Sequence, residues 1–469
     1  MSDIETIIGL SAAQLLPHVA TATRGADDGE LFVENVHAEQ VVLKDGEIQS
    51  PSFSNSMGFG LRRVVGEFQA YAHSSEITPA KLNEAASNLL QARPGQGTLA
   101  LPPSGGAGNY YAAISPLGAA YDLPRRIKLL QTIDAYVRGK DNRVRQVTIA
   151  LAGKVQDVLI VRPDGYVAKD LRPLVHLSIQ VIMDDGTRRE GSHSSYGGRD
   201  DYAKIFANWQ EVADNALRQA DVMMQSIPCP AGEMPVILGA GGSGVIFHEA
   251  IGHGLEGDLI RQGSCFAGML GQMVAAPGVT VVDDGTIAGS RGSLNVDDEG
   301  TPTENTVLID NGKLVGYMND RLNGRLHGTG STGNGRRETY RHLPLVRMRN
   351  TYMLNGQVDP ADIISNTKRA IYAVGYSGGQ VDTTAGKFVF QATEAYLVEN
   401  GQIVAPVKGA TLIGSCLDGL KNIDLIGNDM KLEAAGGTCG KDGQGAPVND
   451  GMPTIRMTSG IIVGGTDAA

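Results

Sequence analysis

Residues 31–50, LFVENVHAEQVVLKDGEIQS, contain the pattern that decides the fold class. A run rich in apolar and β-branched residues ends at Asp45-Gly46, a turn pair that typically joins two antiparallel strands. A second run at 58–65 ends at Gly66-Glu67 and is followed by a third run at 68–72. We therefore expect consecutive strands to pair with one another.

The same mixture of strands, turns and helices continues to about residue 228. Pro228 and Pro230 interrupt the chain after a long amphipathic segment, so we place a domain boundary between residues 228 and 229. Glycine-rich polar stretches without periodicity are expected to be loops. The strands are expected at 144–151, 157–161 and 174–183, the helices at 78–92, 123–138 and 201–224, and the loops at 91–116 and 191–200.

The second half opens with an expected strand at 234–238, a glycine-rich turn and a short helix. Hairpins are indicated at Asp310-Asn311-Gly312 and Asn400-Gly401, and helices at 360–370 and 417–422. Strands neighbour strands here instead of alternating with helices. We therefore predict an α+β protein with two domains, residues 1–228 and 229–469, built from antiparallel, hairpin-rich sheets with flanking helices.

The 469-residue chain has 51 acidic and 40 basic side chains, and its formal net charge is −11. This negative charge argues against direct binding of nucleic acid. No apolar run approaches the roughly 18 residues of a membrane-spanning helix, so we expect no membrane insertion. The acidic N-terminus lacks the features of a secretory signal, and the four cysteines form no disulfide framework. A cytoplasmic location is expected.

Residues 247–258, FHEAIGHGLEGD, carry the clearest indication of chemistry, because they hold two of the nine histidines. Zinc is commonly bound by imidazoles on one rigid element, beside a carboxylate that takes a proton from the attacking water. His248 and His253 are therefore candidate metal ligands, and Glu249 is the candidate catalytic base. The alternative is that both histidines are hydrogen-bonded core residues.

The histidines lie five residues apart, whereas the common zinc-peptidase helix has them four apart. On a regular α-helix, positions i and i+5 point about 140° apart, which is too far for one ion. A π-turn of about 4.4 residues per turn brings them to within roughly 50°. We therefore predict a locally unwound helix, with Gly252 tolerating the distortion.

Catalytic zinc usually has three protein ligands, so a third ligand is needed. Cys439 is the best distant candidate, because its flanking glycines permit close approach and Lys441 favours the thiolate. Glu256 and Asp258, on the histidine segment itself, are the alternatives. An isolated cysteine is more often a small buried apolar residue.

Six motifs give the chain a close resemblance to the TldD/PmbA metallopeptidase family over nearly its whole length. The motifs are HEAIGHGLEGD at 248–258, DDEGTP at 297–302, TGNGRRE at 332–338, NTYM at 350–353, KGATLIG at 408–414 and CGK at 439–441. The resemblance implies a zinc peptidase acting on unfolded proteins or peptides. It also implies that His248, His253 and Cys439 hold the metal and that Glu249 is catalytic.

The same resemblance implies a partner subunit, the paralogue TldE (PmbA), which lacks the metal motif. Because this chain has the motif, the resemblance makes it the catalytic member of a heterodimer. Two other classes of function remain open: a non-catalytic interaction or regulatory subunit, and a metal-dependent amidohydrolase of small substrates. Metal content distinguishes the interaction subunit from the peptidase, and the length of the substrate that is cleaved distinguishes the amidohydrolase from the peptidase.

Three other features have weaker claims to function. The sequence GAGGSG at 239–244 matches a dinucleotide-binding loop, but the expected second strand is absent, so close backbone packing is the better interpretation. Cys416 is expected to be a buried thiol and not a nucleophile. His327 and Tyr340 flank a polar loop and are candidate oxyanion donors, although the loop's polarity alone explains them.

Overall fold

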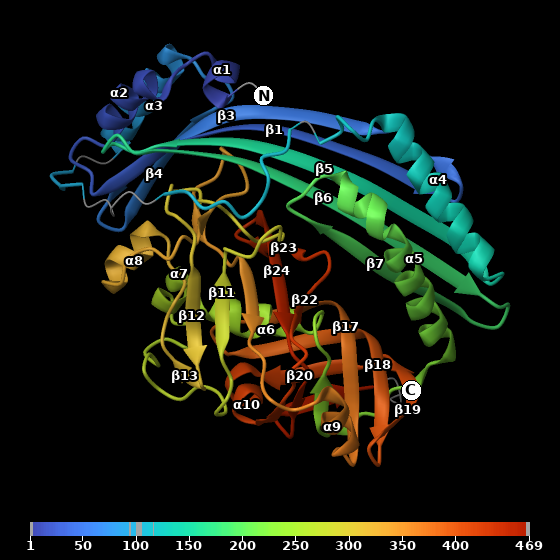
Figure 1. The fold of residues 1–469 in the computed structure, drawn as a ribbon. Coiled ribbons are helices and arrows are strands. Elements are labelled where there is room, and N and C mark those ends of the chain that lie inside the picture. The colour runs from blue at the N-terminus through green and yellow to red at the C-terminus, as the bar shows by residue number, and fades with distance from the viewer. Residues whose placement is uncertain (1–2, 93–94, 100–105, 116, 466–469) are drawn as a thin grey trace.

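The computed structural model describes residues 3–92, 95–99, 106–115 and 117–465. The N-terminal half is organised around a long, curved antiparallel sheet of seven strands in the order β4-β3-β1-β5-β6-β7, with β2 paired to β1 (Figure 1). The strands are β1 (Asp28–Lys44), β2 (Glu47–Ile48), β3 (Ser52–Val65), β4 (Phe68–Ser74), β5 (Val144–Val161), β6 (Val167–Asp184) and β7 (Arg189–Gly198). The hairpins predicted at Asp45-Gly46 and Gly66-Glu67 are confirmed.

Two predictions for this sheet are wrong. The strands expected at 144–151 and 157–161 are one strand, β5, because residues 152–156 pair continuously with β1 and β6. The loop expected at 191–200 is instead the edge strand β7 as far as Gly198. An edge strand has one unpaired side and tolerates polar, glycine-rich sequence. The apolar pattern therefore did not predict this strand.

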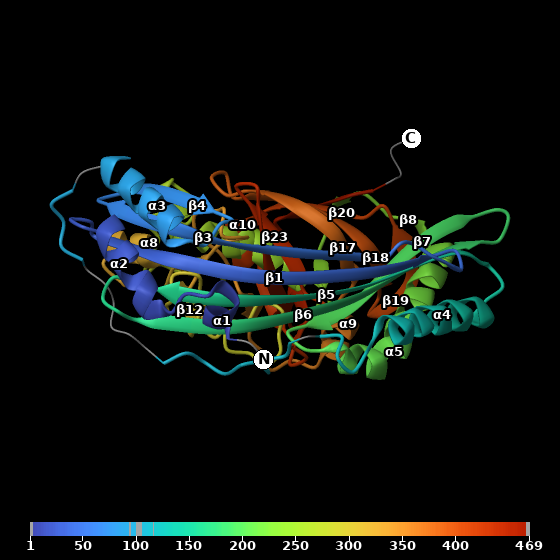
Figure 2. The ribbon, with the colours of Figure 1, turned by 90° about the horizontal axis from the view of Figure 1, so that it is seen from above.

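One face of the sheet is covered by helices at both ends (Figure 2). Leu31 and Val33 of β1 pack in the core beneath the first group of helices, and Val41 and Leu43 pack in the core beneath the second. These residues are an even number of positions apart, so they share one face of β1. The first group is α1 (Ile4–Ile8), α2 (Ala12–Ala22) and α3 (Pro79–Ala92), and the second is α4 (Leu123–Lys140) and α5 (Tyr202–Gln225).

The described parts of the predicted loop at 91–116 carry no helix or strand beyond Ala92, where α3 ends; residues 93–94, 100–105 and 116 lie outside the described residues. The backbone N–H of Gly108 donates to the carbonyl of Asn295, and the hydroxyl of Tyr111 donates to Asp170. These contacts place the second described part, 106–115, between the sheet and the C-terminal half.

The C-terminal half contains a ten-stranded and a second seven-stranded sheet, which are mostly antiparallel. The ten-stranded sheet comprises β8 (Ile227–Pro228), β9 (Gly232–Glu233), β10 (Val236–Leu238), β17 (Arg369–Asp382), β18 (Lys387–Glu399), β19 (Gln402–Lys408), β20 (Thr411–Ser415), β21 (Ile423–Ile426), β25 (Ile455–Met457) and β26 (Ile461–Gly464). The other comprises β11 (Val281–Asp284), β12 (Asn305–Asp310), β13 (Lys313–Leu314), β16 (Asn350–Met353), β22 (Lys431–Leu432), β23 (Gly437–Lys441) and β24 (Gln444–Met452).

Short helices connect these strands: α6 (Gly244–Phe247), α7 (Gly257–Arg261), α8 (Arg321–His327), α9 (Pro360–Ser365) and α10 (Cys416–Lys421), and a small hairpin is formed by β14 (Gly335–Arg336) and β15 (Leu345–Val346). The helix expected at 360–370 ends at Ser365, because the chain from Arg369 enters the ladder between β10 and β18. None of the helices that the structure describes is long and apolar enough to cross a membrane.

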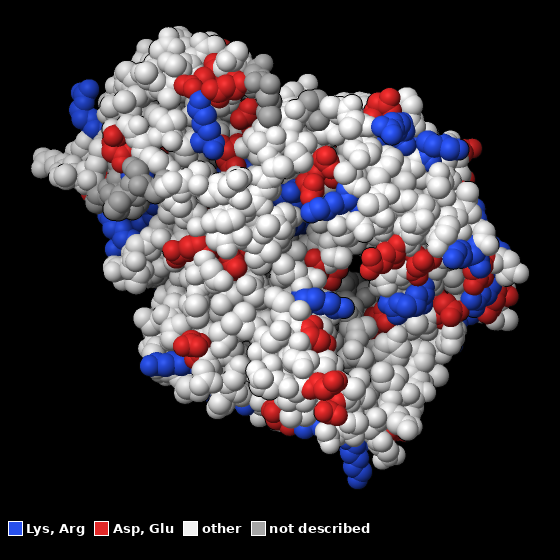
Figure 3. Space-filling model, in the orientation of Figure 1, with Lys and Arg blue, Asp and Glu red and all other residues white. Residues whose placement is uncertain are grey.

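The α+β prediction is confirmed, since helices flank sheets whose strands pair mainly with antiparallel neighbours. The first sheet uses residues 28–198, and the other sheets use residues 227–464. The division at 228 stays a prediction. Acidic and basic side chains are interspersed on the face seen in Figure 3, which is hollowed between the large sheet and the C-terminal half.

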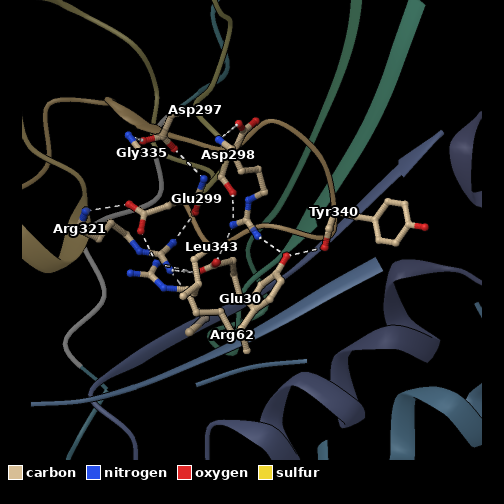
Figure 4. Close-up of polar contacts among 12 residues, drawn as sticks. Glu30, Arg62, Asp297, Asp298, Glu299, Arg321, Gly335, Tyr340 and Leu343 are labelled. Atoms are coloured by element: carbon tan, nitrogen blue, oxygen red, sulfur yellow. Dashed lines mark hydrogen bonds and ion pairs between the residues drawn. The ribbon is translucent and has the colours of Figure 1, made fainter. Parts of the chain in front are cut away.

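A buried ion network joins the C-terminal half to the face of the large sheet that the helices leave free (Figure 4). Glu30 on β1 lies 2.6 Å from Arg321 on α8, 2.8 Å from Arg337 and 3.4 Å from Arg62 on β3. Arg62 also contacts Glu299. Because these side chains are almost fully buried, the two halves depend on one another for charge compensation.

Candidate metal centre

The histidine segment is a helix that unwinds as it passes the site. After α6, residues His248–Gly252 form a π-helical turn, and His253–Leu255 form a 3₁₀ turn. The N–H of His253 donates to the carbonyl of His248, five residues earlier, as the unwound helix requires. The two imidazole centroids lie 5.3 Å apart. The predicted π-turn is confirmed, and it brings both rings to one side of the helix.

Gly252 belongs to this turn for a steric reason. A Cβ atom at this position would overlap the sulfur of Met348, which is buried in the core beneath the helix. The turn therefore needs glycine for close packing, in addition to the conformational tolerance that the sequence suggested.

The third donor comes from strand β23, which lies between the large sheet and α6 (Figure 1). The Sγ atom of Cys439 lies 3.3 Å from Nε2 of His253. One ligand atom from each of His248, His253 and Cys439 lies within 4.8 Å of the others, and all three residues are buried. The hairpin turn Asp442-Gly443, with both residues at positive φ, closes β23 onto β24 beside the helix.

The other candidate ligands, Glu256 and Asp258, form a support behind the cluster. Oε2 of Glu256 lies 2.9 Å from Nδ1 of His253, on the side of the ring away from Cys439. Lys441 donates to Glu256 at 2.9 Å and to Asp258 at 2.7 Å. A carboxylate on the second nitrogen of a metal-binding histidine fixes the tautomer and the orientation of the ring.

The electrostatics of the cluster favour an ionised thiol. Burial alone raises the pKa of the Cys439 thiol, but His248 and His253 outweigh it and lower this pKa to about 4. Burial also opposes ionisation of Glu256, yet Lys441 and His253 lower its pKa to about 2. Lys441 was expected to favour the thiolate directly, but its ammonium group instead binds the two carboxylates.

The donor set has the chemistry of a site for a borderline-soft cation such as zinc. Two imidazoles and a thiolate are typical ligands of this ion. Nδ1 of His248 is buried and has no hydrogen-bond partner among the described residues. Such an orphaned nitrogen is rare in a folded protein and is consistent with a site that a ligand completes.

Glu249 lies at the edge of this cluster. Its Oε2 atom is 3.7 Å from Nε2 of His253, the same nitrogen that faces Cys439. Its side chain is 24% exposed, in contrast to the buried donors. The carboxylate can therefore face both the cluster and an entering molecule.

The weaker candidates have structural explanations. At residues 239–244 the chain packs closely, since a Cβ at Gly244 would overlap the backbone of Gly451, as the sequence interpretation expected. Cys416 is 2% exposed. Nδ1 of His327 lies 3.0 Å from Asn319, and Tyr340 is buried against the large sheet, so these contacts account for both side chains.

Comparisons with known proteins identify the family of the chain. Three family models match the chain: the PmbA/TldA metallopeptidase domain 1 at residues 29–93, the central domain at 117–224 and the C-terminal domain at 231–465. A metalloprotease TldD homolog from Haemophilus influenzae is 43% identical, over 99% of this chain and 98% of the relative. A zinc metalloprotease TldD homolog from Saccharolobus solfataricus is 33% identical, over 56% of this chain and 57% of the relative.

Among solved structures, TldE from Thermococcus kodakarensis has the same fold, with a TM-score of 0.75 and 18% identity over 97% of this chain and 100% of that one. The sequence matches define a metalloprotease. The chain belongs to the PmbA/TldD family, on the TldD side of it.

Proposed function

We propose that the chain is a zinc peptidase that hydrolyses peptide bonds in unfolded proteins or peptides, with His248, His253 and Cys439 as metal ligands and Glu249 as the catalytic residue. The observation that carries the proposal is the convergence of three buried donors beside a half-buried carboxylate. The name of the Saccharolobus relative, which specifies zinc, supports the choice of metal.

The residues divide the work of hydrolysis. A bound zinc ion would polarise the scissile carbonyl and acidify the attacking water. Glu249 accepts the proton of that water and delivers it to the leaving amine. Glu256 favours a proton on Nδ1 of His253, which leaves Nε2 free as a ligand, and Lys441 balances the negative charge of Glu256.

The site is suited to an extended substrate. Among the strands that the structure describes, β23 pairs only with β24, so its other edge is open beside Cys439. An unfolded peptide can add to such an edge through main-chain hydrogen bonds, which recognise conformation more than sequence. This favours a peptidase over an amidohydrolase of small substrates, which needs no strand edge.

We also propose that the chain acts with a metal-lacking paralogue of the TldE type. Three apolar side chains form a row across the ten-stranded sheet: Val389 lies opposite Ile413, and Ile413 lies opposite Ile462. They are 45%, 40% and 54% exposed. Adjacent exposed apolar residues mark protein interfaces, which supports a partner on this sheet face. A homodimer is the alternative assembly.

Metal analysis combined with a peptide-cleavage assay tests the function. We expect about one zinc per chain, removable by a chelator together with the activity. Glu249→Gln should retain the metal and lower turnover by roughly a hundredfold or more, because only the proton acceptor is lost. A metal-free protein with full activity would overturn the proposal. Unchanged turnover in Glu249→Gln would assign the base to another residue.

A further inference from the structure

Two cavities lie between the large sheet and strand β23, on the face of that sheet that the helices leave free. One has a volume of about 260 Å³ and the other about 540 Å³. They share four lining residues, Lys154, Leu174, Arg291 and Thr438, and therefore adjoin one another. Neither is part of the metal cluster described above.

Six of the fourteen residues that line the smaller cavity are Lys or Arg and two are acidic, although the protein as a whole is acidic. Its two carboxylates are already engaged: Asp298 accepts from Arg172, and Glu338 accepts from the backbone of Gly445. No described carboxylate lies within ion-pair distance of Lys154, Arg199 or Arg291. The nearest carboxylates, among them Glu34, Asp170 and Asp298, act on Lys154 and Arg199 only from beyond ion-pair distance, so the positive charge of the cavity is only partly compensated.

Two of these cations each have one buried nitrogen without a hydrogen-bond partner in the described chain, although the other two nitrogens of Arg291 donate to Gly437 and Thr438. Nε of Arg199 and Nη1 of Arg291 are buried without a partner among the described residues, and the Arg199 side chain is 4% exposed in total. Burial lowers the pKa of Lys154, and Arg199 and Arg172 lower it further against the opposing effect of Glu34 and Asp298. Burial and Arg199 lower the pKa of Arg291 to about 10. Uncompensated buried cations are costly, and a bound anion removes the cost.

Strand β23 connects this cavity to the metal cluster. Thr438 lines the cavity, and its Oγ1 accepts from Nη2 of Arg291 at 3.1 Å, whereas the next residue, Cys439, belongs to the cluster. Successive side chains of a strand point to opposite faces. A peptide paired with the open edge of β23 alternates in the same way, so the neighbours of the residue beside Cys439 face the cavity.

We infer that this cavity binds a carboxylate of the peptide substrate, and that Lys154, Arg199 and Arg291 give the enzyme a preference for acidic peptides. The inference rests on the proposed peptidase function. The carboxylate comes either from a Glu or Asp side chain next to the cleaved residue or from the C-terminus of the peptide. Both sources have the same chemistry, and planar guanidinium groups are well suited to it.

The test measures binding separately from cleavage. A fluorescent, otherwise neutral decapeptide is prepared with Glu or Gln at alternate positions, each as the free acid and as the C-terminal amide. Binding is measured with the full-length Glu249→Gln protein, in which the proposed function predicts cleavage slower by roughly a hundredfold or more. We expect loss of the recognised carboxylate to weaken binding about tenfold, and the two arms of the series identify which carboxylate it is.

Variants locate the effect. Lys154→Met and Arg199→Met should reduce the preference to within about twofold, whereas Arg369→Met, which removes an exposed cation on β17, should preserve it. Zinc content and circular dichroism check the fold of each variant. If a variant does not fold, competition decides: inorganic phosphate should displace the acidic peptide from the Glu249→Gln protein more readily than the neutral one.

Equal binding of all four peptides would overturn the inference, even if the parent protein cleaves them. It would also be overturned if phosphate stabilises the protein while no peptide shows a preference, because the cavity would then serve a free anion. If the acidic peptide binds preferentially but the parent cleaves none, the inference stands and the peptidase function fails.

Discussion

Oε2 of Glu256 lies 2.9 Å from Nδ1 of His253 and 2.9 Å from Nζ of Lys441, so Glu256 connects the candidate metal cluster to the strand that carries its thiol. Glu256 is fully buried and also accepts from Lys441, two residues after Cys439 on β23. The histidine segment and the cysteine strand are therefore linked twice, once through the donors and once through this ion pair. The geometry of the donors depends on both links.

Glu256→Gln should weaken zinc binding without abolishing it. The amide cannot supply the negative charge that orients His253 and compensates Lys441, so we expect metal affinity to fall by roughly 10- to 100-fold. Competition with a fluorescent chelator measures this affinity. Asp258→Asn, which alters the other carboxylate of Lys441 without touching His253, is the matched control. An equal loss in both variants would mean that Lys441, and not His253, is the important partner.

Cys439→Ser should remove most of the bound zinc, since a hydroxyl is a far poorer ligand than a thiolate. Cys229→Ser, Cys265→Ser and Cys416→Ser should leave the zinc content unchanged. Atomic absorption on the four purified variants makes the comparison. Full zinc content in Cys439→Ser would transfer the role of third ligand to another residue near the cluster.

The two histidines of the candidate site could be predicted from one short segment, whereas Cys439 lies 186 positions from His253 and was a candidate because of its flanking residues. The five-residue histidine spacing predicted the π-turn, which the structure confirms. The partnership of Lys441 with Glu256 could not be predicted, because the two residues are 185 positions apart and only the fold brings them together. The cation-lined cavity could not be predicted either, because Lys154, Arg199 and Arg291 are isolated basic residues in an acidic chain.

The elements of the fold could likewise be predicted where the local sequence decides them, and not where pairing with distant strands does. Turn pairs such as Asp45-Gly46 revealed the hairpins, and apolar stripes revealed the long helices. Strand β7 was missed because its order comes from pairing with β6, whereas its own sequence is polar. Helix α9 was predicted too long because the ladder between β10 and β18 overrides local helix propensity from Arg369.

Gly252→Ala should disrupt the π-turn, because the added methyl group overlaps the sulfur of Met348. We expect a loss of about 1–3 kcal/mol in the free energy of unfolding, together with reduced zinc content. Gly440→Ala, next to Cys439 but with open space for a methyl group, is the control and should retain the metal. Denaturant unfolding and metal analysis give both readouts. A Gly252→Ala protein with normal zinc would show that the turn can shift without loss of the site.

Glu30→Gln should destabilise the protein strongly at pH 7. Burial raises the pKa of the Glu30 carboxyl, but Arg62, Arg321 and Arg337 outweigh it and lower this pKa to about 2. The substitution leaves three buried arginines undercompensated, so we expect a loss of about 3–5 kcal/mol in the free energy of unfolding. Guanidinium denaturation monitored by fluorescence measures the difference.

Glu299→Gln is the matched comparison, since two of the same arginines, Arg62 and Arg321, contact Glu299. Here burial, with Asp320 and Asp297, outweighs Arg62 and Arg321 and raises the pKa to about 8. This carboxyl therefore holds a proton more readily than that of Glu30. We expect Glu299→Gln to lower the free energy of unfolding less than Glu30→Gln does, although both oxygens of Glu299 accept hydrogen bonds, from Arg62 and from the backbone N–H of Arg321. Equal destabilisation by the two variants would contradict this assignment of charge.

The lowered pKa of Glu30 also predicts the direction in which the stability of the protein changes as the pH falls. The folded-state pKa of Glu30 is lower than its unfolded value, so the unfolded state binds more protons between the two. The stability from Glu30 is therefore present above about pH 4.5 and is lost as the pH falls toward 2. The difference in unfolding free energy between the parent and Glu30→Gln should shrink over that range. A constant difference from pH 7 to pH 3 would show that Glu30 is not ionised in the folded protein.

Ile413→Asp should weaken association with the metal-lacking paralogue. Ile413 is the central member of the exposed apolar row, between Val389 and Ile462, so a charge there is buried against the partner in any complex that uses this face. We expect the dissociation constant to rise by about tenfold or more. Size-exclusion chromatography with light scattering, run on the chain alone and with the paralogue, measures the assembly.

The control is Val315→Asp, which places the same charge at a residue that is 43% exposed and lies just beyond β13, outside the row. Both variants should bind zinc as the parent does, because neither residue contacts the donors. If catalysis needs the paralogue, Ile413→Asp should also lose turnover on an unfolded substrate, and excess paralogue should restore it. Identical assembly of the two variants would place the interface elsewhere. Equal turnover per zinc with and without the paralogue would show that catalysis does not need the partner.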